Sequence, residues 1–257
     1  MALQLGQAIS DGIGRVLSTT GAVLFAGLLA IQLVTQVGIN TAVVGFLPPE
    51  AASAAATGSP GISLPVPPGV GVALTLVGIV VSTVYFVVLA RALSRPRREL
   101  STFPSTLYTR RILRATLATF LGGLVVSVAV SIGFVLLVLP GIFLAASFLL
   151  FIFAAGVEDR GAIGSLRRSW ALARGNRLKL SLLVVAVGVV GGLVGTVGTL
   201  LDVAGLGSLS DVAVTVVNSG FFLAVYGTLA AAYGQLRDGE SRTTTTAASG
   251  TDETARL

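Results

Sequence analysis

Residues 115–157 read ATLATFLGGLVVSVAVSIGFVLLVLPGIFLAASFLLFIFAAGV, and no charged side chain interrupts them. As one helix this stretch would be roughly 65 Å long, about twice the thickness of the hydrocarbon core of a bilayer. It contains Pro140-Gly141, where proline interrupts the helical hydrogen bonds and glycine permits a tight turn. The stretch therefore predicts two membrane-spanning helices, Ala115–Leu139 and Ile142–Val157, joined by a turn at the Pro-Gly pair.

Other apolar blocks without charged residues lie on both sides of this stretch, at Gly21–Val44, Gly69–Ala90, Leu180–Leu201 and Val212–Tyr233. Each has about the length that one crossing needs, roughly 20 residues. The fold class predicted is therefore all-α, a polytopic membrane bundle of six transmembrane helices. In the proline-rich loop after the first block, a short helix is expected to begin at Pro49.

The composition agrees with a membrane protein and excludes several kinds of chemistry. Hydrophobic residues make up 54% of the chain and charged residues only 11%, whereas soluble domains carry about 25% charged residues. The chain contains no cysteine and no histidine, which excludes disulfides, thiolate or imidazole metal ligands, and nucleophiles paired with histidine. We therefore expect no metal site, no cofactor and no enzymatic activity.

The basic residues alternate with the apolar blocks so that all 17 fall on one side of the predicted topology. The loops on the other side carry only Glu50, Asp202 and Asp211. The positive-inside rule makes the basic side cytoplasmic, with both termini there and the protein in the cell membrane. The net charge of +6 thus reflects topology, and no nucleic-acid partner is expected.

Residues 1–236 are interpreted as the membrane domain. Residues 237–257 are rich in Thr, Ser and Ala with mixed charge, and we expect them to form a disordered cytoplasmic tail. Three cytoplasmic segments have the pattern of amphipathic interfacial helices, namely Leu3–Leu17, Pro104–Arg114 and Gly161–Arg174.

The last of these segments has the most regular pattern. Ile163, Leu166 and Trp170 recur at helical spacing and predict an apolar face toward the membrane interface. Asp159 is a candidate N-cap of this helix and Gly175 a candidate C-cap.

The cytoplasmic arginines are candidate contacts for anionic lipid headgroups, because basic clusters beside membrane helices attract such headgroups. The candidates are Arg110, Arg111, Arg167, Arg168, Arg174 and Trp170. The alternative is that these arginines only direct the topology.

Two sets of residues inside the predicted spans have more than one interpretation. Gln32, Gln36 and Asn218 either make hydrogen bonds between helices or line a polar path for a substrate. Small residues in the fifth span either pack inside the bundle or form the seam of a homo-oligomer, since small residues let helix backbones approach; they are Gly188, Gly191, Gly192 and Gly195.

One set of motifs resembles a known family. Pro140-Gly141-Ile142 is followed by Glu158-Asp159-Arg160-Gly161, then by the segment AIGSLRRSW at residues 162–170, and finally by Arg174-Gly175-Asn176. This order resembles the six-helix membrane family that includes the membrane domain of glycerophosphoryl diester phosphodiesterases and related bacterial and archaeal proteins of unknown function. The resemblance implies fold and membrane location. It does not imply hydrolysis, because that chemistry needs a catalytic histidine and an attached soluble domain.

The function predicted is a non-enzymatic membrane component that organises lipids or a protein partner through its basic cytoplasmic side. A facilitator or transporter of a small or lipid-like substrate is the alternative. A membrane subunit of a separately encoded enzyme is a further one. The expected partners are membrane lipids with anionic headgroups, together with a protein partner or a second copy of the chain.

Overall fold

The computed structural model describes residues 3–48, 50–51, 62–205 and 207–254, and within these ranges it contains helices and no strands. Six segments are long and apolar enough to cross a membrane. The predicted all-α class and the predicted number of membrane-length helices are therefore confirmed. The short helix expected from Pro49 lies mostly outside the described residues.

The membrane-length segments contain α2 (Thr19–Phe46), α4 (Pro68–Leu93), α6 (Ile112–Leu136), α7 (Val138–Phe148) with α8 (Phe151–Gly156), α10 (Arg177–Val203) and α11 (Gly207–Thr254). The shorter elements are α1 (Leu5–Val16), the 3-10 helix η1 (Arg97–Glu99), α5 (Thr106–Thr109) and α9 (Ala162–Ala173). Helices α2, α4 and α10 extend their predicted blocks by one to three residues at each end, because helical hydrogen bonding continues past the last apolar side chain. Helix α6 begins and ends three residues before its predicted range, and α11 continues to Thr254.

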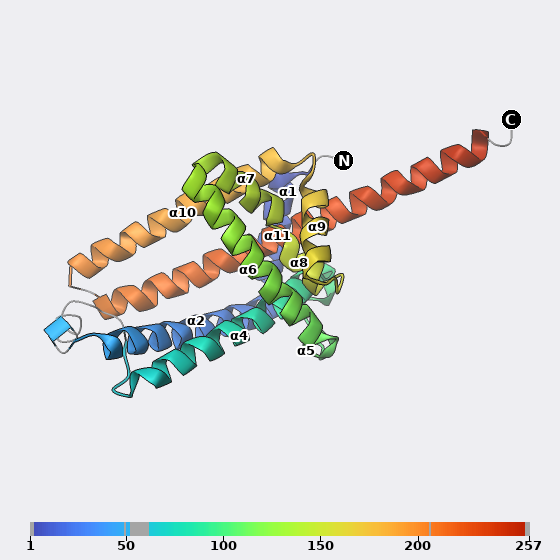
Figure 1. Ribbon diagram of the computed structural model, residues 1–257. Helices are drawn as coiled ribbons and strands as arrows, with labels where there is room; N and C mark the ends of the chain where they lie inside the picture. The colour runs from blue at the N-terminus through green and yellow to red at the C-terminus, as the bar shows by residue number, and fades with distance from the viewer. Residues whose placement is uncertain (1–2, 49, 52–61, 206, 255–257) are drawn as a thin grey trace.

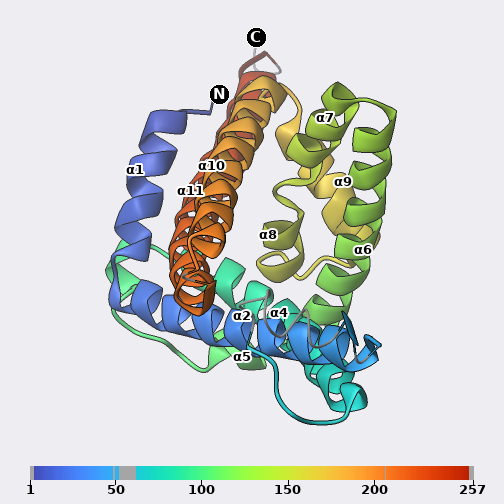
Figure 2. The ribbon, with the colours of Figure 1, turned by 90° about the vertical axis from the view of Figure 1, so that its left-hand side faces the viewer.

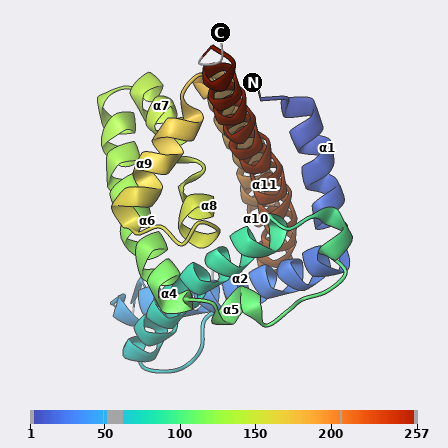
Figure 3. The same ribbon diagram turned by 90° about the vertical axis from the view of Figure 1, so that its right-hand side faces the viewer.

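The long helices run side by side, and two short helices cross them. In Figure 1, α2, α4, α10 and α11 share one general direction, while α1 and α9 run across them at the end where the N-terminus lies. Figures 2 and 3 show α6, α7, α8 and α9 gathered on one side of α11 and α1 on the other. The projecting end of α11 carries the C-terminus away from the bundle. The predicted division into residues 1–236 and a disordered tail at 237–257 stays a prediction.

The turn between the third and fourth spans does not lie at the Pro-Gly pair, so its predicted position is wrong. Helix α6 ends at Leu136, Leu137 is extended, and α7 begins at Val138. Pro140 is thus in the first turn of α7, where its missing N–H has no intrahelical acceptor to lose. Gly141 serves helix packing instead, because a Cβ on Gly133 would lie 2.9 Å from the Gly141 Cα.

The fourth span is divided into α7 and α8 by a break at Leu149 and Leu150. The carbonyl of Ser147 accepts a hydrogen bond from the Ser169 hydroxyl of α9 at 2.9 Å. In an unbroken helix this carbonyl would accept from the backbone N–H four residues later. The contact with α9 therefore satisfies a backbone group that the break releases.

The three predicted interfacial segments have different outcomes. Helix α1 forms within its predicted range, and α9 forms within Gly161–Arg174. The segment Pro104–Arg114 does not form one helix: it holds the single turn α5 and the first three residues of α6, because Arg111 at φ 43° separates the two. Their location at a membrane interface stays a prediction.

Helix α9 packs on the protein through a face other than the predicted membrane-facing one, and the membrane-facing role of Ile163, Leu166 and Trp170 stays a prediction. Ser165, Ser169, Leu172 and Ala173 are buried, whereas Ile163 is 69% exposed. Small hydroxyl-bearing side chains let α9 approach α7 and α8 closely, and Ser169 has a backbone acceptor there. Hydrophobicity alone does not reveal such a face, because serine counts as polar.

The predicted caps of α9 are half correct. Gly161 is the N-cap, and Asp159 lies in the left-handed region at φ 51°. Asp159 binds arginines instead, as described below. Gly175 follows the helix at φ +84°, a conformation that glycine adopts without strain, so its predicted capping position is confirmed.

The closest helix crossings lie at glycines that the sequence pattern does not single out. Helix α1 crosses α11 where a Cβ on Gly12 would lie 2.4 Å from the Thr228 backbone nitrogen. Helices α2 and α4 meet where a Cβ on Gly71 would lie 2.4 Å from the Ala42 backbone nitrogen. Backbone at these distances cannot move aside as a flexible side chain does, so the crossings require glycine.

We expect Gly12→Ala to lower the stability of the folded protein by about 1–3 kcal/mol, because its methyl group would overlap the α11 backbone. Gly6→Ala in the same helix is the matched control, since nothing lies within 4 Å of its Cβ position. The control should be neutral or stabilised by up to about 1 kcal/mol through helix propensity. Thermal unfolding in detergent, followed by circular dichroism, measures both. Equal midpoints for the two variants would contradict the α1–α11 crossing.

Candidate functional site

The arginine-bearing turns and short helices meet at one end of the bundle, which we call the basic end. There Arg15 of α1 donates to the carbonyls of Leu93 and Arg95, both at 2.6 Å. Lys179 at the start of α10 donates to the Leu3 carbonyl at 2.6 Å. These contacts hold the N-terminal segment against the ends of α4 and α10.

Asp159, just after α8, binds two arginines from different elements. Its Oδ1 lies 2.9 Å from Arg91 Nη2, and its Oδ2 lies 2.9 Å from Arg110 Nη2. The side chains of Arg91 and Asp159 are each only 8% exposed. Arg91 also donates to the carbonyls of Gly156 at 2.7 Å and Leu107 at 3.2 Å. One guanidinium thus joins α4 to α5 and to the end of α8.

The neighbouring Glu158 binds a second set of elements. Its carboxylate accepts from Arg160 at 2.6 Å, from Arg168 of α9 at 3.2 Å, and from the Tyr233 hydroxyl of α11. Arg168 also forms an ion pair with Glu240 of α11, with Nη1 and Oε2 2.6 Å apart. Two adjacent carboxylates therefore connect α4 and α5 on one side with α9 and α11 on the other.

These contacts lower the pKa of Glu158. Burial by itself would raise it, but the hydrogen bonds from Tyr233, Arg160 and Arg168 and the charge of Arg168 outweigh that effect and hold the pKa below its ordinary value. Burial by itself would lower the pKa of Arg168, but its hydrogen bonds and charge interactions with Glu240 and Glu158 raise it. The cluster therefore favours the fully charged state at neutral pH.

A carboxylate whose pKa is lower in the folded than in the unfolded state stabilises the fold at every pH above the pKa that it has in the unfolded state. That contribution is lost as the pH falls from about 4.5, the ordinary value for glutamate, through the folded pKa. We expect the thermal midpoint of the wild type to fall steeply on acidification below about pH 5, and Glu158→Gln to be less stable at pH 7 with a flatter pH profile. Glu99→Gln, which removes an exposed carboxylate at the same end, is the control. A wild-type pH slope in Glu158→Gln would count against this cluster.

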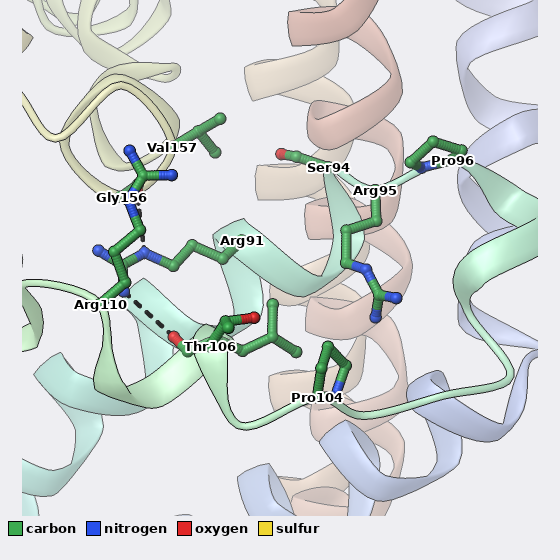
Figure 4. Close-up of a pocket in the computed structure, with 10 residues that line it drawn as sticks. Arg91, Ser94, Arg95, Pro96, Pro104, Thr106, Arg110, Gly156 and Val157 are labelled. Carbon is green, nitrogen blue, oxygen red and sulfur yellow. Dashed lines mark hydrogen bonds between the residues drawn. The ribbon is translucent and has the colours of Figure 1, made fainter.

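A cavity of about 360 Å³ lies beside the Arg91–Asp159 pair, between the end of α4, α5 and the end of α8. Three guanidiniums line it, from Arg91, Arg95 and Arg110, and no carboxylate does. Figure 4 shows Arg91 and Arg110 on one side of the cavity and Arg95 with Pro104 on the other. Such a concave set of fork-shaped donors suits an anion.

The predicted lipid-contact arginines do not form one pocket. Arg110 lines the cavity and binds Asp159, whereas Arg168 binds Glu158 and Glu240. Arg111, Arg167 and Arg174 are exposed on the same end of the molecule. Their contact with lipid stays a prediction.

Trp170 is half-buried against α7. Its ring packs on Phe143 and Phe148 with centroids 5.8 and 5.6 Å away, and the Arg177 guanidinium lies 4.3 Å from its centroid. The tryptophan therefore fastens α9 to α7 and to the start of α10.

Two of the predicted polar-path residues line one groove of about 260 Å³ between α2 and α4. Gln32 and Gln36 line it together with Thr35, Ser82 and Tyr85. Gln32 donates to the Ser219 hydroxyl at 3.0 Å, so one interhelical hydrogen bond is present. Asn218 precedes that serine and is not among the lining residues.

The glycines predicted to pack the fifth span do not contact the rest of the described structure. A Cβ at Gly188, Gly191, Gly192 or Gly195 would meet nothing within 4 Å. The interpretation that this face packs inside the bundle is therefore wrong. Helix α10 contacts α11 near its far end instead, where a Cβ on Gly198 would lie 3.0 Å from Val214.

Sequence reasoning missed Arg91, Glu158, Asp159 and Tyr233. The available pattern was an Arg at the end of one apolar block and a Glu-Asp pair directly behind another. Charges in those places are ordinary for loops, and only the packing of α4 against α8 shows that they pair.

Comparison with known proteins assigns the chain to a family without assigning an activity. The family described as "Domain of unknown function (DUF7847)" matches residues 3–236. The chain belongs to this family. No curated protein and no solved structure matches it. The DUF7847 match carries no link to the glycerophosphoryl diester phosphodiesterases.

Proposed function

We propose that this protein is a non-enzymatic component of the cell membrane that holds anionic lipids at its cytoplasmic face. The observation that carries the proposal is the gathering of arginines at the basic end, several of them exposed: Arg111, Arg114, Arg167 and Arg174. Exposed basic residues next to membrane helices attract anionic headgroups by about 1 kcal/mol each. Lipids held there would in turn surround and organise a protein partner or a second copy of the chain.

The orientation in this proposal rests on the positive-inside rule, which makes the basic end and both termini cytoplasmic. The motif resemblance to the membrane domain of glycerophosphoryl diester phosphodiesterases supports membrane location and supplies no hydrolytic residues, since the chain has no histidine.

The absence of cysteine makes the orientation testable by single-cysteine labelling. Ser63 and Ser101 are both exposed, and they lie in loops at opposite ends of the long helices. We expect a membrane-impermeant thiol reagent to label Ser63→Cys in intact cells and Ser101→Cys only after permeabilisation. The reverse pattern would invert the topology and remove the basic end from the cytoplasm.

Lipid retention tests the proposed function directly. We expect native mass spectrometry of the protein in mild detergent to show enrichment of phosphatidylglycerol over phosphatidylcholine. Arg167→Gln/Arg174→Gln should reduce that enrichment by up to about 30-fold, because two charges contribute about 1 kcal/mol each. Arg167→Lys/Arg174→Lys keeps the charge and is the matched control. Equal retention of the two lipids by the wild type would refute the proposal.

A second candidate function, a facilitator of a small or lipid-like substrate, is favoured by the groove at Gln32 and Gln36. Its polar side chains lie near the middle of two membrane-length helices, α2 and α4, where they would offer hydrogen bonds away from water. Vesicle flux that is abolished by Gln36→Leu, with lipid enrichment unchanged, would favour this function. A membrane subunit serving a separately encoded enzyme would instead co-purify with that enzyme.

A further inference from the structure

The cavity beside Arg91, here called the head cavity, carries more positive than negative charge. Asp159 alone balances both Arg91 and Arg110, and the nearest carboxylate to Arg95 is Glu99 at 3.5 Å. Arg91 is fixed by its carbonyl acceptors, whereas the Arg110 side chain, paired with Asp159, is 69% exposed. The head cavity therefore has one buried cationic wall and one solvent-exposed cationic arm.

A hydroxyl without a partner also faces this cavity. Ser94 lines it, and its buried Oγ has no hydrogen-bond partner within the described structure. In Figure 4 this hydroxyl points from α4 toward the Val157 side. Buried polar atoms are generally satisfied, so an unpartnered one at a cavity wall indicates a ligand or solvent acceptor there.

A second hollow, here called the chain groove, lies along α4 and α8 at a greater distance from the basic end. It has a volume of about 390 Å³ and runs between α4, α6 and the start of α8. Its walls are mostly apolar, with Phe86, Phe120, Leu124 and Phe151 among them. Phe120 and Leu124 are 46% and 57% exposed, so the groove opens on the outer surface of a membrane-length helix.

The same two helices line both hollows. The charged cavity lies nearer the basic end and the apolar groove farther along, as the headgroup and acyl chain of an amphiphile require. Ser94, the C-cap of α4, lines the head cavity, and Thr83 of α4 lines the chain groove about three turns or roughly 16 Å away along the helix. Helix α8 contributes Gly156 to the cavity and Phe151 to the groove. The groove therefore lies farther from the basic end than the cavity, along the same two helices.

We propose that the head cavity and the chain groove together bind one anionic phospholipid. Its phosphate lies between Arg95 and Arg110 within reach of Ser94, and one acyl chain lies along the groove. Guanidinium forks suit phosphate oxygens, and the apolar groove accounts for a lipid in preference to a soluble phosphate. This inference deepens the proposed function and rests on it, since it supplies the specific site that a general attraction by exposed arginines does not.

The test is native mass spectrometry of the full chain titrated with dioleoyl phosphatidylglycerol in mild detergent. We expect one phosphatidylglycerol to bind the wild type first. Arg95→Gln/Arg110→Gln should weaken that binding at least tenfold by removing phosphate donors, and Ser127→Trp should do so by filling the groove, which Ser127 lines. Circular dichroism melting establishes that each variant is folded, and Arg110→Gln alone is the fallback, because that side chain is largely exposed.

Two matched controls separate the site from general effects. Arg98→Gln removes one exposed charge from the same end of the molecule but outside the lining of the head cavity, and Val128→Trp adds the same ring on an exposed part of α6 outside the groove. Both should bind like the wild type. Full binding by Arg95→Gln/Arg110→Gln, or by Ser127→Trp, would overturn the joint site. Glycerol 3-phosphate that binds as tightly as the lipid would overturn the lipid in favour of a soluble anion.

The outcomes also separate this inference from the proposed function. If Arg167→Gln/Arg174→Gln loses phosphatidylglycerol while Arg95→Gln/Arg110→Gln retains it, the site is wrong and anionic-lipid retention stands. If the wild type takes up phosphatidylglycerol and phosphatidylcholine equally, both fail.

Discussion

The contact on which the basic end depends is the buried ion pair between Arg91 and Asp159. Removing a charge from water costs several kcal/mol per ion, and pairing offsets this only where the remaining donors are also satisfied. Arg91 meets that condition, because its other nitrogens donate to the carbonyls of Gly156 and Leu107. The pair therefore holds the end of α4 at a fixed position against α5 and α8. Loss of either partner would leave an uncompensated charge inside the bundle.

The same constraint shapes the segment around the pair. Asp159 occupies the left-handed region at φ 51°, and Arg111 does so at φ 43°. Such conformations are uncommon for residues with side chains and persist where the surroundings hold them. Here the chain turns sharply after α8 and before α6, and those turns bring Asp159 and Arg110 together. The head cavity is the space that remains between these turns and the end of α4.

In the rest of the bundle, some helices pack with their backbones in close contact and others leave apolar surface exposed. Glycines at the α1–α11 and α2–α4 crossings let backbones approach, while the glycine face of α10 meets no other helix. Inside a bilayer, packing of small residues contributes to helix association because burial from water no longer does. The bundle is thus tight at the α1–α11 and α2–α4 crossings and looser along α10.

The sequence by itself determined the helical class, the number of membrane-length helices and the approximate ends of most of them. It could do so because backbone polar groups in hydrocarbon must be satisfied within each segment, and that requirement appears directly as long uncharged blocks. The candidate arginines were visible for the same reason, since charges are confined to the ends of those blocks.

Only the tertiary structure decided which charges pair, where the turn before α7 lies and which glycines pack. Pairing depends on distances between residues far apart in the chain, such as Arg91 and Asp159 or Glu158 and Tyr233. A G-x-x-x-G pattern indicates that a close approach is possible, and the neighbouring helix decides whether it occurs. Gly192 belongs to such a pattern and has no close neighbour, whereas Gly12 lies outside any such pattern and packs against the α11 backbone. Local pattern thus specifies each helix, and the specific contacts between helices specify the site.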